Sequence, residues 1–462
     1  RYEWTATLLA GMHFNITTVG FYDAQSTEQV DYIVRQTEMT TIVCTEDYAA
    51  RLVAMRKNDM VPTLKTLVVT NECKPALLQQ AQEVGINVVT FSGVLAAGEA
   101  APQTAWVEAT KDAVYILSYT SGTTGDPKGV KLTHKNILAA GRSSVCRVVM
   151  VPGETMISYL PLTHSFEQAL FAFSLIQQLK IGFFCGDTLK ITEDCQRLRP
   201  NFFPSVPRLY NKIYAKLNEG LSAATGCKRW LATKAVAAKT ANYNANGTVT
   251  HGCWDSLVFK KMSALLGGQV RLMVTGSAPI EKQVIDFLKI CFCCPIIEGY
   301  GLTETAASSC VASLEDPVTG HVGGPVEALK VRLRDLPELQ YMSSDKPYPR
   351  GEICFKGASV FQGYYKREDK TAECFDEDGW FTTGDVGLVY PNGSIKIIDR
   401  VKNIFKLSQG EYIAPEKIEQ IMNMSPLIAQ FFLYGDSFKN CCVAIVVAEE
   451  STVMKWARDE SK

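Results

Sequence analysis

Short apolar runs alternate with amphipathic stretches over the first part of the chain. The runs TTVGFY, TTIVC, TLVVT and INVVTF are typical of buried strands, whereas the segments between them have the spacing of helices. Ser26, followed three residues later by Gln29, predicts a capping box at the start of one helix. Strands that alternate with helices favour a parallel sheet covered on both faces. The stretch from Gly93 to Gln103, rich in glycine, alanine and proline, predicts a loop.

The middle of the chain repeats the strand pattern next to small residues. The apolar run AVYILSY, residues 113–119, leads into a loop rich in glycine and threonine and then into a helix that begins near His134. Two further apolar runs, residues 269–274 and 295–297, each end at small or glycine residues. Ligands in open α/β sheets bind beyond the carboxyl ends of the strands, so we expect these ends to meet at one cleft.

The pattern changes to strands without intervening helices after about residue 326. The runs KVRLR, GEICFKG, VGLVY and SIKIID predict a smaller antiparallel unit, with a hairpin at Pro391-Asn392-Gly393. Beyond Arg400, a helix with Pro415 near its first turn and two more strands predict a third domain. We therefore expect an α/β fold with three regions: N-terminal α/β subdomains over 1–325, incomplete at the N-terminus; a β-rich subdomain over 326–400; and the start of a small, truncated α+β C-terminal domain over 401–462.

Composition narrows the possible classes of protein. The chain has 462 residues, of which 47% are hydrophobic and 21% charged, which excludes a disordered or fibrous protein. Its 47 Lys and Arg residues balance 48 Asp and Glu residues, so the overall charge indicates neither a nucleic-acid partner nor attraction to an anionic membrane. The longest uncharged apolar stretch, residues 168–179, is shorter than the roughly 20 residues that span a bilayer. The start at Arg1, without a leader, indicates a fragment or a trimmed product.

Fifteen cysteines are scattered along the chain, with a cluster at Cys291, Cys293 and Cys294. Adjacent cysteines without a nearby histidine fit neither a zinc site nor a simple disulfide framework. We interpret them as reduced thiols and expect a cytoplasmic protein.

The segment TSGTTGDPKG, residues 120–129, combines hydroxyl groups, glycines and a lysine directly after a predicted strand. Such a loop lets the backbone approach a phosphate closely and supplies positive charge beside it. It differs from the Walker loop in its glycine spacing, and no Ser or Thr follows its lysine. A flexible surface loop is the alternative. The residues that we expect at the phosphates are Thr120, Ser121, Gly122, Thr123, Thr124, Gly125 and Lys128.

This segment resembles the phosphate loop of the adenylate-forming superfamily, which contains the acyl-CoA synthetases, the firefly-type luciferases and the peptide-synthetase adenylation domains. Five further motifs follow in that family's order: GSAPI (276–280), EGYGLTE (298–304), GEICFKG (351–357), DGWFTTGD (378–385) and IDRVKNIFKLSQGEYIAPEKIE (398–419). Within the family, LPLTHSFEQ, GHVGGPV and NIFKLSQGEYIAPEKIE resemble the long-chain fatty acyl-CoA synthetases. The resemblance covers nearly the whole chain.

The resemblance implies an ATP- and Mg²⁺-dependent long-chain fatty acid:CoA ligase. Such an enzyme joins the fatty acid to the α-phosphate of ATP, which yields acyl-AMP and pyrophosphate, and then lets coenzyme A displace AMP. Two enzymatic alternatives stay open: an acyl-AMP ligase that transfers to a carrier protein, and a CoA ligase for another small carboxylate. A non-catalytic acyl-adenylate-binding protein is a third.

The resemblance also implies roles for individual residues in the first half-reaction. Lys128 would stabilise charge on the phosphates, and Glu304, after Thr303, would hold Mg²⁺, although a helix-capping role for Glu304 is an alternative. Asp385 would accept hydrogen bonds from the ribose, with Arg400 beside it, although an aspartate after a glycine is also typical of a turn. The residues implied at the nucleotide are Gly276, Ser277, Ala278, Glu298, Gly299, Tyr300, Gly301, Asp385 and Arg400.

The remaining implied roles concern the acyl group and the second half-reaction. Lys402 would be the hinge of a rotating C-terminal domain, Lys406 a cation near acyl-AMP, and Gly410 the point where coenzyme A enters. His164 would position the reacting carboxylate, with a structural histidine as the alternative. The apolar helix of residues 168–179 would line an acyl tunnel or belong to the core.

One implied residue has no match. The family carries a lysine close to the end of its C-terminal domain that contacts the α-phosphate, and no such motif precedes Lys462. We therefore expect this chain to adenylate slowly while it keeps the thioester-forming groups. The sequence leaves open the acyl chain length, the oligomeric state and peripheral association with the cytosolic face of a membrane.

Overall fold

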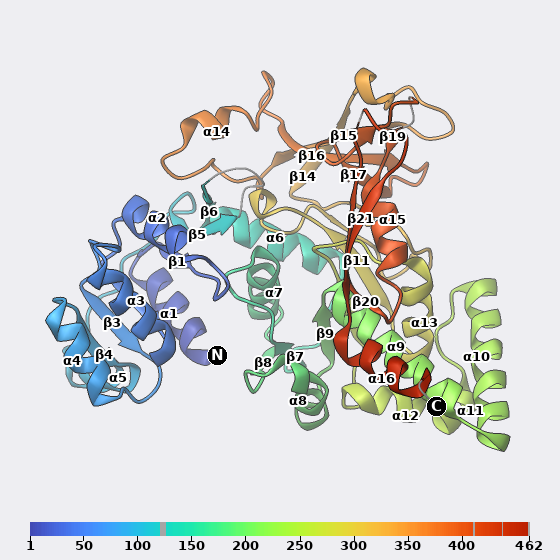
Figure 1. Ribbon diagram of the computed structural model, residues 1–462, viewed down its shortest axis with the longest axis horizontal. Coiled ribbons are helices and arrows are strands. Elements are labelled where there is room, and N and C mark those ends of the chain that lie inside the picture. Colours follow the sequence, from blue (N-terminus) through green and yellow to red (C-terminus); the bar gives the residue numbers. More distant parts are fainter. Residues whose placement is uncertain (121–125, 410–411, 437, 461–462) are drawn as a thin grey trace. The chain divides into compact units, whose positions relative to one another are not determined.

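A computed structural model describes residues 1–120, 126–409, 412–436 and 438–460 (Figure 1). The chain folds into two compact units. Unit 1 consists of Arg1–Ile137, Leu160–Gln168 and Phe361–Glu373. Unit 2 consists of Leu138–Tyr159, Ala169–Val360 and Cys374–Lys462.

Unit 1 contains two small sheets. The first sheet is parallel, in the order β2-β3-β4, and the second places β5 between a parallel β1 and an antiparallel β6. Its strands are β1 (Thr18–Gly20), β2 (Thr41–Cys44), β3 (Thr66–Val69), β4 (Asn87–Thr90), β5 (Val114–Thr120) and β6 (Lys128–Thr133). Its helices are α1 (Tyr2–His13), α2 (Thr27–Thr37), α3 (Glu46–Lys57), α4 (Pro75–Glu83), α5 (Phe91–Ala100) and α14 (Glu368–Ala372).

The predicted alternation of strands and helices in unit 1 is confirmed, with one exception. Ser26 and Gln29 form the expected capping box: the Gln29 N–H donates to Ser26 Oγ at 3.3 Å, and the Ser26 N–H donates to Gln29 Oε1 at 3.0 Å. The loop predicted from Gly93 to Gln103 is wrong, because α5 occupies most of that stretch. Thr90 caps this helix by accepting the Gly93 N–H at 3.0 Å, and the alanines that suggested a loop are strong helix formers.

The main sheet of unit 2 has seven strands in the order β13-β12-β11-β10-β9-β7-β8. Strands β7 to β11 run parallel, whereas β12 and β13 are antiparallel to their neighbours. The strands are β7 (Thr155–Ser158), β8 (Lys180–Phe183), β9 (Phe202–Ser205), β10 (Leu272–Thr275), β11 (Ile296–Tyr300), β12 (Cys310–Val311) and β13 (Gly324–Pro325).

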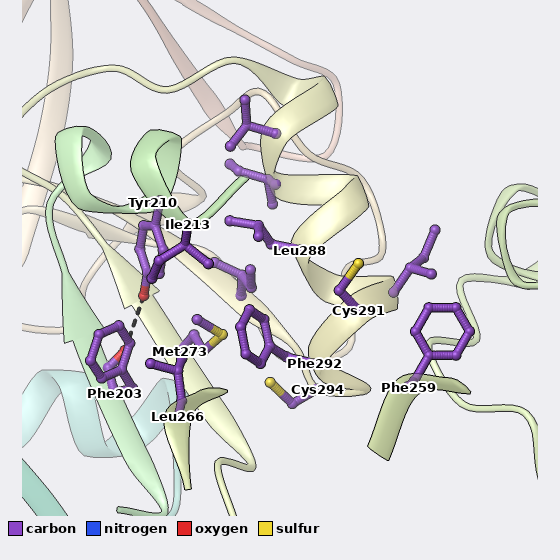
Figure 2. Packing of buried hydrophobic residues seen from close by; sticks show 14 of the residues in the cluster. Phe203, Tyr210, Ile213, Phe259, Leu266, Met273, Leu288, Cys291, Phe292 and Cys294 are labelled. Atoms are coloured by element: carbon purple, nitrogen blue, oxygen red, sulfur yellow. Dashed lines mark hydrogen bonds between the residues drawn. The ribbon is translucent and has the colours of Figure 1, made fainter. Parts of the chain in front are cut away.

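The helices beside this sheet pack on it in an extensive buried cluster, part of which Figure 2 shows. They are α8 (Ile191–Leu198), α9 (Pro207–Ala223), α10 (Gly226–Asn246), α11 (Gly252–Trp254), α12 (Lys260–Ser263) and α13 (Lys282–Phe292). Phe203 on β9, Met273 on β10 and Phe292 on α13 are almost fully buried in it. The Tyr210 hydroxyl on α9 donates to the Phe203 carbonyl at 3.0 Å, which fixes the start of this helix against the sheet (Figure 2). Two more helices, α6 (His134–Arg147) and α7 (Ser165–Ile176), have residues in both units.

The predicted antiparallel unit is confirmed as a four-stranded sheet in the order β14-β15-β16-β17. Its strands are β14 (Leu329–Arg334), β15 (Arg350–Gly357), β16 (Phe381–Val389) and β17 (Ile395–Arg400). Buried Ile353, Phe355 and Ile395 form its core. The expected hairpin closes with the Gly393 N–H donating to the Tyr390 carbonyl at 2.9 Å.

The last part of the chain forms two short antiparallel pairs and two helices. These are β18 (Phe405–Lys406), β19 (Tyr412–Ile413), α15 (Pro415–Met422), β20 (Ile428–Tyr434), β21 (Val443–Ala448) and α16 (Glu450–Glu460). Pro415 occupies the first turn of α15, as expected. The domain boundaries at 325 and 400 stay a prediction. Among the described residues, no helix combines the length and the apolar character needed to cross a bilayer.

Candidate active site

The carboxyl ends of neighbouring parallel strands in unit 2 carry two of the predicted motifs. Thr275 at the end of β10 is in register with Ser205 on β9 and with Glu298 on β11. The segment 276–278 follows β10, and the segment 299–301 lies at the end of β11. The ends of these two strands are therefore neighbours in the sheet, as expected, whereas the cleft expected at this edge stays a prediction.

Close backbone packing explains the small residues at this edge. A Cβ atom on Gly301 would lie 2.3 Å from the carbonyl carbon and oxygen of Ala307, far inside contact distance. Ser277 has a φ of 70°, a left-handed conformation that side chains rarely adopt outside constrained sites. The backbone here is thus held in a particular path, and at Gly301 only a residue without a side chain fits against Ala307.

The turn that follows Gly301 carries Thr303 and Glu304. It is a short 3₁₀ helix, Thr303–Thr305, stabilised by the Leu302 N–H, which donates to Thr305 Oγ1 at 2.9 Å. The Ser309 hydroxyl donates to the same Thr305 oxygen at 2.7 Å. These bonds order the backbone on which Glu304, the expected magnesium ligand, is presented.

Tyr300, Asp385 and Arg400 form one interacting group although they lie far apart in the sequence. The Tyr300 hydroxyl donates to Asp385 Oδ2 at 2.6 Å. Arg400 Nε lies 3.3 Å from Asp385 Oδ1, and the two residues are paired across β16 and β17. Each carboxylate oxygen of the buried Asp385 therefore has one fixed partner, which leaves lone pairs for further donors such as vicinal hydroxyls.

Opposing influences act on the pKa of the Asp385 carboxyl group. Burial raises the pKa of its carboxyl group above the ordinary value, whereas the hydrogen bond from Tyr300 and the charge of Arg400 lower it. The carboxylate of Glu304 acts in the same direction as burial, so it lies within electrostatic reach of Asp385. A bound cation at Glu304 would relieve this repulsion.

Glu352, in the GEICFKG motif, supports the turn that carries Asp385. The Gly384 N–H donates to Glu352 Oε1 at 2.8 Å, and Arg334 forms an ion pair with the same carboxylate. The Thr383 hydroxyl donates to the Ile353 carbonyl at 2.7 Å. The sequence indicated this motif but no role for Glu352. A charged residue within an apolar strand, which is costly to bury without a partner, could have indicated one.

Glu298 accepts a hydrogen bond from a neighbouring loop. Its Oε1 accepts the Gly320 N–H at 2.8 Å. Burial raises the pKa of this carboxyl group to about 7, in spite of the opposing effects of the Gly320 bond and of the ammonium of Lys289. Its expected contact with the nucleotide stays a prediction.

The segment around the expected hinge is tied to both β17 and α15. Asp399 accepts the Arg400 N–H at 2.7 Å and the Glu416 N–H at 3.1 Å. Burial, together with the charge of Asp399, raises the pKa of Glu416 to about 7. Lys402 is exposed in the turn after β17, where a hinge lysine is expected.

Lys406 lies on β18 with its side chain exposed. Its ammonium is 5.0 Å from the centre of the Tyr412 ring, and the Tyr412 hydroxyl donates to the Glu338 carbonyl at 2.5 Å. Tyr412 thus holds Lys406 over an aromatic face, a contact that the sequence did not indicate.

Unit 1 carries the described ends of the phosphate loop. Thr120 and Lys128 are paired across β5 and β6, and the Lys128 ammonium lies 5.0 Å from the centre of the Tyr364 ring. A Cβ atom on Gly129 would lie 2.9 Å from the Tyr119 ring, so glycine is required beside the lysine. Ser121, Gly122, Thr123, Thr124 and Gly125, like Gly410, lie outside the described residues.

His164 is also in unit 1 and precedes α7. Its Nδ1 accepts the Phe166 N–H at 3.1 Å, which places the proton of a neutral ring on Nε2. Burial lowers the pKa of this imidazole, so the neutral form dominates at pH 7. This hydrogen bond orients the ring, and an Nε2–H group is a donor that suits the expected role as a positioning group.

The residues 1–365 match the model of the family described as "AMP-binding enzyme". The chain belongs to the AMP-binding enzyme family. The predicted resemblance is thereby confirmed. Its curated relatives include "Long chain acyl-CoA synthetase 6, peroxisomal" of Arabidopsis thaliana, which is 42% identical over all of this chain and 65% of the relative. They also include "Long-chain-fatty-acid--CoA ligase 1" of Homo sapiens, which is 39% identical over 99% of this chain and 66% of the relative.

Solved structures of adenylation domains have the same fold as this chain, which confirms the predicted α/β fold class. The A domain of carboxylic acid reductase from Segniliparus rugosus, solved with AMP and a co-purified carboxylic acid, superposes with a TM-score of 0.81. It is 26% identical and is matched over 98% of this chain and 70% of that chain. The present chain spans slightly less than two thirds of the length of the Arabidopsis and human relatives.

The structure adds two polar groups at the carboxyl edge of unit 2 that sequence reasoning missed. The Tyr159 hydroxyl, just after β7, donates to Ser205 Oγ at the end of β9 at 2.7 Å. Tyr159 and Ser205 both come at the end of an apolar run. Because ligands bind beyond strand ends in such sheets, this position in the sequence could have indicated them. Within the described ranges, no group of three or more His, Cys, Asp and Glu side chains is arranged to hold a metal ion.

Proposed function

We propose that this chain catalyses the ATP- and Mg²⁺-dependent ligation of a long-chain fatty acid to coenzyme A. The arrangement of Tyr300, Asp385 and Arg400 carries the proposal, because a buried carboxylate with both oxygens oriented is the group that a ribose diol requires. The family and the names of the relatives supply the reaction class. ATP, Mg²⁺ and coenzyme A are the corresponding cofactor and co-substrates.

In the first half-reaction the chain binds ATP and orients the fatty carboxylate. Asp385 accepts the ribose hydroxyls, and segments 276–278 and 299–301 provide backbone and the Tyr300 ring for the base. Lys128 brings positive charge to the phosphates. His164, neutral at pH 7, donates from Nε2 to the carboxylate, which is already ionised and needs no base.

Glu304 fits a magnesium ion. Mg²⁺ binds through one or two carboxylates together with substrate phosphates and water, so a single glutamate suffices. The repulsion between Glu304 and Asp385 is the observation that favours a cation here. When bound, the ion would neutralise charge on the phosphates.

In the second half-reaction, Lys406 approaches acyl-AMP and coenzyme A displaces AMP. The hinge role of Lys402 and the coenzyme A contact of Gly410 belong to this proposal. All fifteen cysteines are free thiols, which supports a reducing, cytoplasmic location, with peripheral membrane contact left to experiment.

The test supplies preformed palmitoyl-AMP and coenzyme A and measures palmitoyl-CoA. We expect thioester formation that falls by about 100-fold in Lys406→Ala, the loss typical of one oriented charge contact. Lys417→Ala, another exposed lysine in the same region, is the matched control and should keep the wild-type rate. Transfer to a phosphopantetheinyl carrier protein but not to free coenzyme A would replace this function with acyl-carrier ligation.

A further inference from the structure

A fully buried lysine in unit 2 contacts a cysteine. Lys239, on α10, has no exposed side-chain surface. Its Nζ lies 2.6 Å from Asp255 Oδ1, 2.8 Å from the Ile290 carbonyl oxygen and 3.0 Å from Cys293 Sγ. The ammonium also lies 4.2 Å from the centre of the Phe259 ring. Three acceptors saturate its three N–H donors, so the nitrogen is held in one position against the sulfur.

Cys293 is also held in place. It ends α13 in a left-handed conformation with a φ of 55°, and its sulfur lies 3.8 Å from the Ile290 carbonyl oxygen. The side chain is partly exposed, and Asp255 beside it keeps 25% of its side-chain surface in solvent. This partial exposure gives a small oxidant a route toward Cys293, and the amine of Lys239 lies 3.0 Å from its sulfur.

We propose that Lys239 and Cys293 form an oxidative cross-link in which one oxygen atom bridges the lysine nitrogen and the cysteine sulfur. A bent N–O–S link requires the nitrogen and the sulfur to approach each other only slightly from the observed 3.0 Å, whereas a direct nitrogen–sulfur bond would require a much larger approach of two fixed atoms. The link would tie α10 to the junction between α13 and β11, the strand that leads to Tyr300. This modification is independent of the proposed ligase activity.

The reaction balances with hydrogen peroxide as the oxidant. Lys239 first gives a proton to Asp255 and through it to solvent. One peroxide molecule converts the thiol to a sulfenic acid and water. A second removes the hydrogen of S–O–H and one hydrogen of the amine as two waters, so that an N–O bond forms. In sum, thiol, amine and two peroxide molecules yield the N–O–S link and three water molecules.

The neighbouring thiols offer the main competing chemistry. Cys291 and Cys294 are buried, with at most 2% of their surface exposed. Burial raises the pKa of Cys293 as well, although Lys239 opposes this and Asp255 reinforces it. Because the thiolate is the form that peroxide attacks, cross-linking should accelerate by about tenfold per pH unit below the pKa of the thiol.

The test treats the purified chain with ¹⁸O-labelled hydrogen peroxide at pH 7 and pH 9, followed by peptide mapping without reductant. We expect one linked pair of peptides, containing Lys239 and Cys293, with the mass of both plus one labelled oxygen and minus two hydrogens. It should form faster at pH 9 and should separate on treatment with a thiol reductant. Cys253→Ser, which removes an exposed thiol elsewhere, should keep the link, and Cys293→Ser should lose it.

Three results would overturn the proposal, and all can be read from the wild-type protein. They are a disulfide between Cys293 and either neighbouring cysteine, a Cys293 oxidised to an acid while Lys239 stays unmodified, and a linked pair that lacks the labelled oxygen. Because the linked peptide is detected in the unaltered chain, failure of a variant to fold cannot mask the outcome.

Discussion

Replacing Glu298 with glutamine isolates the cost of keeping a carboxyl group in a low-dielectric position. Glutamine retains an oxygen that can accept the Gly320 N–H, so the geometry of the loop is preserved. The change removes only the ability to ionise. In the folded chain, burial raises the pKa of Glu298 to about 7 from an ordinary 4.5, while the ammonium groups of Lys289 and Lys282 oppose the rise.

The direction in which the free energy of unfolding changes with pH depends on whether the folded or the unfolded chain binds the proton of Glu298 more tightly. Between pH 4.5 and 7, the folded chain keeps a proton that the unfolded chain has released, so the free energy of unfolding of the wild type falls as the pH rises through this window. Below pH 4.5 both states are protonated and nothing is lost. Above pH 7 the loss is complete, at about 3 kcal/mol at most.

Urea denaturation followed by tryptophan fluorescence at pH 5 and pH 8 measures this difference. We expect the free energy of unfolding of the wild type to fall by about 2 to 3 kcal/mol from pH 5 to pH 8 through this group. Glu298→Gln should lack this fall, so its stability relative to the wild type rises by the same amount. Glu315→Gln, which neutralises an exposed carboxylate in the same unit, should show almost no such change. An equal difference between Glu298→Gln and the wild type at both pH values would refute the reasoning.

Three further changes test the site. Tyr300→Phe removes the 2.6 Å hydrogen bond to Asp385, and calorimetry should show AMP affinity lower by about tenfold, since hydrogen bonds to charged groups contribute roughly 1.5 to 3 kcal/mol; unchanged affinity would exclude this bond from nucleotide binding. Gly301→Ala forces a Cβ atom to within 2.3 Å of the Ala307 backbone and should lower the thermal midpoint by several degrees; a wild-type midpoint would contradict the packing. Lys128→Ala should slow formation of acyl-AMP by about 100-fold or more while thioester formation from added acyl-AMP stays near the wild-type rate; equal losses in both steps would argue for general damage.

Features that depend only on residues close together in the sequence could be predicted from it. The capping box at Ser26, the hairpin at Gly393 and the proline at the start of α15 each follow from local backbone preferences. The same local rules failed at α5, where glycine and alanine were given the weight of loop residues although Thr90 supplied a helix cap. Composition alone could not decide between the two conformations.

Side-chain partners from distant segments could not be predicted in this way. Tyr300 and Asp385 were both assigned to the nucleotide, but their mutual hydrogen bond depends on how β11 and β16 pack within unit 2. Lys239 lies on a helix whose other lysines are exposed, so its complete burial against Cys293 has no local signal. The sequence motifs predicted which residues carry chemistry, whereas the electrostatic environment of these residues and the contacts that support them came only from tertiary packing.

The formation and fate of palmitoyl-AMP test the account most directly. The chain would be mixed with ATP, Mg²⁺ and palmitate, quenched with acid, and analysed by mass spectrometry before and after coenzyme A is added. We predict that palmitoyl-AMP accumulates slowly without coenzyme A, and that its disappearance afterwards matches the appearance of palmitoyl-CoA and AMP. Formation of palmitoyl-CoA together with ADP, without any palmitoyl-AMP, would contradict the account.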